Sequence, residues 1–107
     1  MSDYLYPRDV VWTSKVVAAT GTGVAIVAVQ TWARALWIVA AKVTGANTGA
    51  VYIGDSTVDK TSLQYLSLSP GDYWEMPIPE GTKVDLNTLY VDAATNGDSI
   101  LIGYIQA

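Results

Sequence analysis

The stretch S-I-L-I-G-Y-I-Q, residues 99–106, indicates the fold more directly than any other segment. It follows Asn96-Gly97, a dipeptide typical of tight hairpin turns because both residues tolerate positive φ. Through that turn, the stretch is predicted to pair antiparallel with Leu89–Asp92. Successive side chains of a strand point to opposite faces of a sheet. The segment therefore predicts two apolar faces, one formed by Ile100, Ile102 and Tyr104 and the other by Leu101, Gly103 and Ile105.

The rest of the chain also reads as short strands, because it is rich in the β-branched and aromatic residues that suit a pleated sheet. Turn signals rich in Gly, Pro and Asn separate these segments. The pattern predicts an all-β fold, an antiparallel β-sandwich or a jelly-roll-like barrel. The eight expected strands are Val10–Ala18, Val24–Gln30, Ala35–Val43, Ala50–Ile53, Leu63–Leu68, Tyr73–Pro77, Leu89–Asp92 and Ser99–Gln106.

One further turn has a clear mechanism. In Ser69-Pro70-Gly71-Asp72, the proline ring fixes φ at the second position and the glycine allows the positive φ of the third. These are the requirements of a type II turn. The sequence therefore predicts a chain reversal between residues 69 and 72.

Length and composition indicate one compact domain. The chain has 107 residues, 50% of them apolar and 15% charged, so it can bury a core without disulfides or metals. We expect a single sandwich domain over residues 10–107, preceded by an arm or edge segment over residues 1–9. The chain contains neither Cys nor His, which excludes disulfides, Cys/His metal sites and His-dependent triads. No cofactor is expected.

The charge distribution argues against binding to nucleic acid. The net charge is −4 and no two basic residues are adjacent, so a phosphate-binding patch for nucleic acid is not expected. The acidic residues concentrate in residues 55–107, which predicts an acidic surface there.

The uncharged stretch 16–33 is interrupted by glycines and threonines and does not resemble a membrane span. No secretory signal is visible at residues 1–9, so synthesis in a cytoplasm is expected.

The strands around Val24, Trp37 and Leu101 carry apolar side chains on both faces. A small sandwich normally alternates apolar and polar residues, because one face of each sheet is wet. A wide apolar patch usually marks an interaction surface. We therefore expect identical subunits to pack together. The alternative is that loops of the same chain cover the outer faces of these strands.

Residues 1–9 carry large apolar side chains beside a proline. Aromatic anchors provide much contact area for few lost rotations, so the segment is interpreted as an arm that docks on a neighbouring subunit. An ordinary edge strand is the alternative. The expected contacts with other copies or with a capsid are Tyr4, Leu5, Tyr6, Pro7, Arg8, Val24, Ile26 and Trp37.

Motifs for metal binding and catalysis are incomplete. Asp55–Asp59 begins like a calcium loop, but Lys60 stands where glycine is needed and Leu66 where glutamate is needed. A looser calcium site shared by four aspartates is an alternative to their use as turn formers. No carboxylate pair is singled out for glycoside hydrolysis. The chain is interpreted as a non-enzyme without a metal site; the four aspartates are Asp55, Asp59, Asp92 and Asp98.

Sugar binding is the main rival function, because exposed aromatic rings on sandwich modules form platforms for pyranose rings. Trp37 lies within an apolar run and Trp74 is in phase with Met76, so packing is the better interpretation of both. Trp32 and Tyr73 remain as candidate glycan contacts.

Three stretches carry a family resemblance: A-N-T-G-A-V-Y-I-G-D-S-T-V at 46–58, L-S-P-G-D-Y-W-E-M-P at 68–77 and D-L-N-T-L-Y-V-D-A-A-T-N-G-D-S-I at 85–100. Together they resemble small β-sandwich virion proteins of tailed bacteriophages, which include capsid decoration (cement) proteins and head-fibre or tail-associated modules. The resemblance covers about the last two-thirds of the chain. It brings no catalytic residues.

The resemblance implies a structural protein of the virion that sits on the capsid surface, contacts the major capsid protein and self-associates, commonly as a homotrimer. It also leaves open a tail- or fibre-associated module, or a carbohydrate-binding module for attachment to a host surface. In this interpretation the arm and the doubly apolar strands make the contacts. The loops that contain G-D-S-T and D-A-A-T-N-G-D are expected to face solvent.

Overall fold

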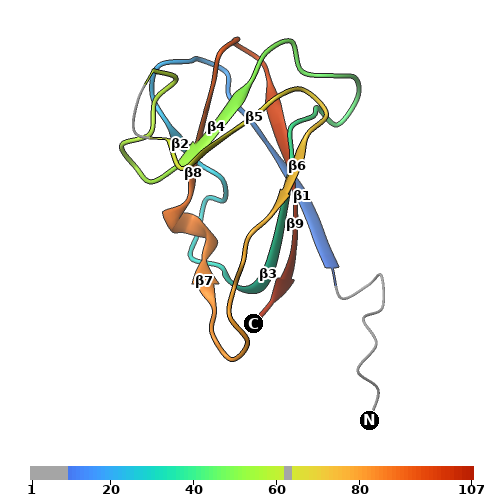
Figure 1. Ribbon diagram of the computed structural model, residues 1–107, viewed down its shortest axis with the longest axis vertical. Coiled ribbons are helices and arrows are strands. Elements are labelled where there is room, and N and C mark those ends of the chain that lie inside the picture. The colour runs from blue at the N-terminus through green and yellow to red at the C-terminus, as the bar shows by residue number, and fades with distance from the viewer. Residues whose placement is uncertain (1–9, 62–63) are drawn as a thin grey trace.

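The computed structural model describes residues 10–61 and 64–107, which form two antiparallel sheets packed face to face (Figure 1). The five-stranded sheet contains β1 (Val10–Val16), β3 (Trp32–Val39), β6 (Tyr73–Glu75), β7 (Val84–Asp85) and β9 (Ser99–Gln106). The four-stranded sheet contains β2 (Val24–Ala25), β4 (Val51–Gly54), β5 (Leu66–Leu68) and β8 (Tyr90–Ala93). The all-β sandwich predicted from the sequence is confirmed.

The strand order is that of a jelly roll. The five-stranded sheet runs β1-β9-β3-β6, with β7 paired to β3, and the four-stranded sheet runs β2-β8-β4-β5. Most connections cross from one sheet to the other. The exceptions are the β4–β5 hairpin and the connection from β6 to β7, which both pair with β3. This arrangement places the first and last described strands side by side, so that β1 forms one edge of the five-stranded sheet.

The core lies between the sheets and is built from the inward-facing residues of each strand. Ile100 and Ile102 of β9 and Leu36 and Ile38 of β3 are fully buried there, and Tyr104 packs against them. The two faces predicted for residues 99–106 are therefore confirmed. Between Ala33 and Ala35 the register of β3 against β9 shifts by one residue, a β-bulge that keeps both Ala33 and Leu36 in the core.

The pairing predicted for Asn96-Gly97 is wrong. Gly97 does have positive φ, at 87°, but β8 and β9 belong to different sheets. The reason lies in Asp98, whose carboxylate accepts hydrogen bonds from the backbone N–H groups of Thr48 (2.9 Å) and Gly49 (2.8 Å). These bonds hold the start of β9 beside the 40–50 connection, so the chain crosses to the five-stranded sheet.

The predicted strand Val24–Gln30 is also wrong beyond its first two residues. β2 ends at Ala25, and residues 26–31 continue without strand pairing. Ile26 is nonetheless 2% exposed and belongs to the core, against which Val24 and Val27 also pack. The apolar residues up to Val27 therefore serve the interior of their own domain, whereas Val29 is 69% exposed.

Strand boundaries differ elsewhere by a few residues. β3 begins and ends earlier than the predicted Ala35–Val43. Two elements were not predicted from the sequence, the strand β7 and the 3-10 turn η2 (Leu86–Thr88). The turn at residues 69–72 is confirmed: the Asp72 N–H donates to the Ser69 carbonyl at 2.9 Å, and Gly71 has φ 88°.

Buried carboxylates tie the loops to the sandwich. Asp92 and Asp98 are both fully buried, and Asp92 accepts the Gly21 N–H with both oxygens, each at 3.1 Å. Asn47 exchanges two bonds with the Ser99 backbone, at 2.7 and 3.0 Å. The expectation that the D-A-A-T-N-G-D loop faces solvent is thus wrong for both aspartates, whereas Asp55 in the G-D-S-T loop is exposed.

Candidate interaction surface

The side of the five-stranded sheet that points away from the core is here called the outer face. It consists of the residues that alternate with the buried ones in β1, β9, β3 and β6, and the strand register aligns them in rows. Its members are Val10, Trp12, Ser14 and Val16, then Leu101, Gly103 and Ile105, then Ala35, Trp37 and Val39, and finally Tyr73 and Glu75. Glu75 is charged, and so is the exposed Arg34 at the bulge of β3, which lines a hollow together with Ala35 and Glu75.

Trp12 dominates the outer face. It stands opposite Gly103 in the β1–β9 pair, and the absence of a side chain there lets the indole lie on the backbone. A Cβ added at Gly103 would come within 2.5 Å of Cζ3 of Trp12. The ring is supported from below and yet 60% exposed, which leaves it available to a partner.

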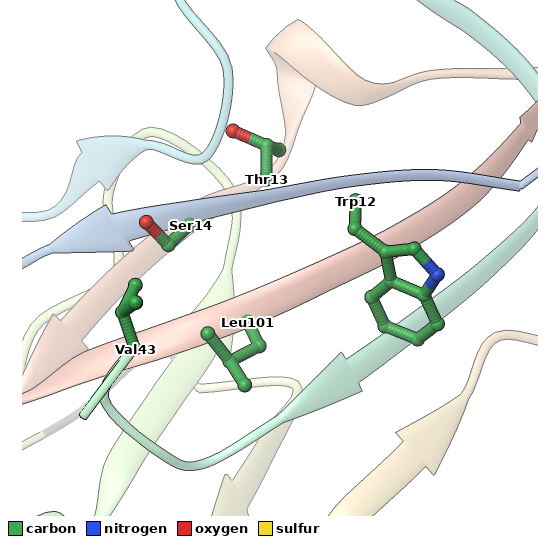
Figure 2. A pocket seen from close by; sticks show the side chains of 5 residues that line it. All are labelled: Trp12, Thr13, Ser14, Val43 and Leu101. Atoms are coloured by element: carbon green, nitrogen blue, oxygen red, sulfur yellow. The ribbon is translucent and has the colours of Figure 1, made fainter. Parts of the chain in front are cut away.

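Next to Trp12 lies a shallow depression of about 350 Å³. Figure 2 shows Trp12, Leu101 and Val43 around it, with Thr13 directed to the opposite side of β1. Val43 follows β3 and is 73% exposed. Apart from the Ser14 hydroxyl and the N–H of the Trp12 indole, the groups on the outer face are hydrocarbon. The depression is therefore suited to apolar contact rather than to catalysis or to an ion.

The apolar surface continues across the sheet. Trp37 pairs with Gly103 from the β3 side and is half-buried, and Val39 lies beside Leu101 in the next row. Tyr73, opposite Val39 on β6, is 74% exposed. Trp12, Val43 and Tyr73 are far more exposed than the core and lie on a single side of the molecule. Such a contiguous patch is uncommon on a free monomer.

The predicted contact residues divide into three groups. Trp37 does lie on the outer face, while Val24 and Ile26 do not: Ile26 is in the core and Val24 packs against it. The expectation that Ile26 contacts another subunit is corrected, because its side chain is covered within the chain, whereas the contact expected of the partly buried Val24 stays a prediction. Tyr4, Leu5, Tyr6, Pro7 and Arg8 lie outside the described residues.

The two candidate glycan contacts do not form one platform. Trp32 begins β3 and Tyr73 pairs with Val39 at its other end, a separation of about 23 Å along the strand. The Trp32 ring is already occupied on one side by Lys83 Nζ, 4.5 Å from its centroid. The structure therefore does not bring the two rings together around a single sugar.

The four aspartates weighed for calcium are also used separately. Asp92 and Asp98 accept backbone N–H groups in the interior. Asp55 accepts the Thr57 N–H at 2.8 Å together with the Thr57 hydroxyl, and Asp59 accepts the N–H and the hydroxyl of Thr61 in the same way. Within residues 10–61 and 64–107, no three acidic side chains gather in a way that could hold a metal ion. The Thr57 hydroxyl, followed by the Thr57 N–H, holds the pKa of Asp55 below its usual value.

Sequence reasoning missed Trp12 and Val43 as members of the surface. The available signal was Gly103, a glycine inside an otherwise apolar strand, which often marks a close approach by another group. Recognising which group approaches requires the pairing of β1 with β9. That pairing joins opposite ends of the chain, so no local pattern reveals it.

Among the residues that the structure describes, no helix has the length and apolar character needed to cross a membrane. Comparison of the chain with protein-family models, with curated proteins and with solved structures finds no match.

Proposed function

We propose that this protein is a non-enzymatic structural component of a bacteriophage virion, of the capsid-decoration type, which binds through the outer face of its five-stranded sheet. The observation that carries the proposal is the uncovered apolar surface formed by Trp12, Val43 and Tyr73, which are 60%, 73% and 74% exposed. A surface of this kind gains free energy when another protein covers it.

The magnitude is sufficient for assembly. Full burial of an aliphatic side chain such as Val43 contributes about 1.5–3 kcal/mol, and a large aromatic ring such as Trp12 contributes at least as much through its greater area. A few such residues around a depression resemble the arrangement of binding hot spots. No charged residue lines the depression beside Trp12, which reduces the desolvation cost of covering it.

Two further observations support the virion setting. The jelly-roll strand order is one that viral capsid domains use, although lectins share it, so the fold alone does not decide the function. The sequence segments at 46–58, 68–77 and 85–100 resemble small phage virion proteins. A decoration protein that binds the assembled shell, and not free subunits, shifts the equilibrium toward the shell.

The test compares two valines of similar exposure. Val43 (73%) lines the depression beside Trp12 and Leu101, whereas Val29 (69%) lines a different hollow, between β1 and the 26–31 segment, and is not part of the outer face. Purified protein is added to undecorated heads of the phage that encodes it, and bound protein is measured by co-sedimentation. We expect Val43→Ser to weaken binding about tenfold or more and Val29→Ser to bind like the parent chain. No binding by the parent chain contradicts the proposal.

A carbohydrate-binding function is the second candidate, favoured by the Trp12 ring lying flat on Gly103. A supported and exposed indole is suited to stacking on a pyranose. In this case the protein is retained on polysaccharide and its Trp fluorescence changes with sugar, and Trp12→Ala abolishes both effects. Retention on polysaccharide without binding to heads selects this function over capsid decoration.

A further inference from the structure

We propose that β1 pairs with β1 of a second copy, antiparallel and centred on Thr13, so that two five-stranded sheets become one continuous sheet. The proposal deepens the structural function given above and rests on it, because it names a second copy as the partner along the edge next to Trp12. It is carried by the backbone geometry of the edge strand.

The first step is to determine which backbone groups of β1 are free. The Val17 N–H donates to the Asp98 carbonyl at 2.8 Å, so Val17 belongs to the residues whose backbone points toward β9. Backbone direction alternates along an antiparallel strand, and Val11, Thr13 and Lys15 therefore also point toward β9. The N–H and C=O groups of Val10, Trp12, Ser14 and Val16 point away from the sheet, at its open edge.

The opposite side of the sheet supports this alternation independently. The Met76 N–H donates to the Leu36 carbonyl at 3.0 Å, so the backbone N–H and C=O groups of Leu36 face β6. The backbone groups of its neighbours Ala35 and Trp37 therefore face β9. Trp37 pairs with Gly103, so the backbone N–H and C=O groups of Gly103 face β3 and not β1. Its partner Trp12 must then direct its backbone to the open edge, in agreement with the bond made by Val17.

The edge lacks the features that usually prevent pairing. Exposed edge strands are commonly short, charged or interrupted by proline, whereas β1 has seven residues, no proline and one charge, Lys15. Its side chains include Val11, Trp12 and Val16, which are 40%, 60% and 52% exposed. A long, apolar and sparsely charged edge is a template for another strand.

One register satisfies the open edge completely. When two β1 strands meet with Thr13 opposite Thr13, Val10 faces Val16 and Trp12 faces Ser14, and each pair occurs twice. All four outward residues of each copy then lie in hydrogen-bonded pairs, which exchange two bonds each. Moving the register by two residues loses one of these pairs. The centred register also places the large Trp12 side chain opposite the small Ser14.

Charge permits the same register. Lys15 of one copy lies opposite Val11 of the other, and the two Lys15 residues are about 13 Å apart along the strands. This distance exceeds the screening length of about 8 Å at physiological ionic strength, so their repulsion is weak. The two Thr13 side chains form a cross-strand pair of a favourable kind. Nothing in the strand opposes pairing with itself.

The contact is smaller than a standard interface, which takes about 20–30 residues from each partner. Seven residues of strand, with the exposed side chains of Trp12, Val11 and Val16, predict a dimer whose dissociation constant is on the order of micromolar. The proportion of dimer therefore rises with protein concentration. A shell that holds neighbouring copies side by side strengthens the dimer further, because it raises their effective concentration.

The first test removes one outward donor. Ser14→Pro eliminates the N–H that faces the open edge and leaves the bonds to β9 in place, so the thermal unfolding curve shows whether the domain is intact. Sedimentation velocity over a concentration series is expected to show a dimer for the parent chain and a dissociation constant at least about tenfold higher for Ser14→Pro. Tyr73→Ser, at the opposite edge of the same sheet, is expected to leave the dimer unchanged.

The second test fixes the register through cysteines, which the chain lacks. In the proposed dimer, two residues at position 13 face each other with Cα atoms about 4.5 Å apart, within reach of a disulfide. Thr13→Cys is therefore expected to form a covalent dimer under mild oxidation. Val11→Cys is the matched control: its two copies lie about 13 Å apart and are expected to stay uncrosslinked.

The outcomes separate this inference from the proposed function. Equal crosslinking of both cysteine variants, or of neither, overturns the edge pairing, as does a dimer that Ser14→Pro does not weaken. Loss of self-association with Tyr73→Ser and not with Ser14→Pro also overturns it and assigns self-association to the outer face. Binding to phage heads is measured separately with the valine variants, so it can succeed or fail independently of the β1 dimer.

Discussion

The indole of Trp12 packs on the backbone of Gly103, so closely that a Cβ at position 103 would lie 2.5 Å from Cζ3 of the ring. The two residues stand opposite each other in neighbouring strands. Gly103 therefore determines the position of the aromatic ring on the outer face, and through it the shape of that face.

Gly103→Ala is expected to displace the Trp12 ring. Because the added methyl group cannot share the space of the indole, the free energy of unfolding falls by about 1–3 kcal/mol, as in other overpacked sites. Urea denaturation measures the change, and a shift in Trp emission reports the moved ring.

The control for this prediction is the same substitution in a Trp12→Ala background. There the methyl group meets no ring, and the cost of Gly103→Ala should drop by at least about 0.5 kcal/mol, the coupling expected of residues in contact. An equal cost in both backgrounds shows that Trp12 does not restrict position 103.

Asp98→Ala is expected to be strongly destabilising. It leaves the N–H groups of Thr48 and Gly49 without their buried acceptor, at a cost of about 2–4 kcal/mol in the free energy of unfolding. Thermal or urea unfolding provides the measurement. Asp72→Ala is the matched comparison, because its carboxylate accepts one backbone N–H at an exposed turn, and a loss under about 1 kcal/mol is expected there. Similar losses contradict the structural importance of burial at Asp98.

Ile26→Ala tests the corrected role of the 26–31 segment. Ile26 is 2% exposed in the core, so its truncation should lower the free energy of unfolding by about 2–5 kcal/mol. Val29→Ala, at 69% exposure in the same segment, should change it by less than about 0.5 kcal/mol. If Ile26→Ala instead leaves stability intact and weakens self-association, Ile26 is an intersubunit contact after all.

The Asp55 loop is expected to lose stability in acid. The Thr57 hydroxyl and then the Thr57 N–H hold the pKa of Asp55 below its usual value. A group whose pKa is lower in the folded state stabilises that state above its unfolded pKa, near 3.9. This contribution is lost as the pH falls through the lower, folded pKa. Carbon-detected NMR titration of the Asp55 carboxyl measures the pKa directly.

Thr57→Val is the control for this titration, because it removes the hydroxyl and keeps the backbone N–H. The pKa of Asp55 should rise in this variant toward its usual value. An Asp55 carboxyl that titrates identically in both proteins contradicts the assigned cause.

Local sequence patterns predicted the fold class, the strand 99–106 with its two faces, and the turn at residues 69–72. Each of these depends on side-chain alternation or on the φ preference of Pro and Gly, which neighbouring residues alone determine. The hairpin at Asn96-Gly97 failed because the destination of the chain depends on Asp98 and its distant partners Thr48 and Gly49. A turn dipeptide contains no information about them.

The candidate surface was predictable in kind and less so in membership. Apolar residues on both faces of a strand correctly indicated an uncovered surface at Trp37 and Leu101. The same pattern was misleading at Ile26, because the chain leaves the sheet after Ala25 and turns that side chain into the core. Trp12 joins the surface only through the pairing of β1 with β9.

The pairing of β1 with β9 also has a consequence for biosynthesis. Val10 lies opposite Ile105, so the sheet that carries the outer face cannot close until residue 105 has emerged from the ribosome. Contacts so distant in sequence make folding slow. Until these contacts form, the edges of β1 and β3 that face β9 have no partner strand. Newly made chains therefore depend on a late docking step, and before it their open strand edges are exposed to aggregation.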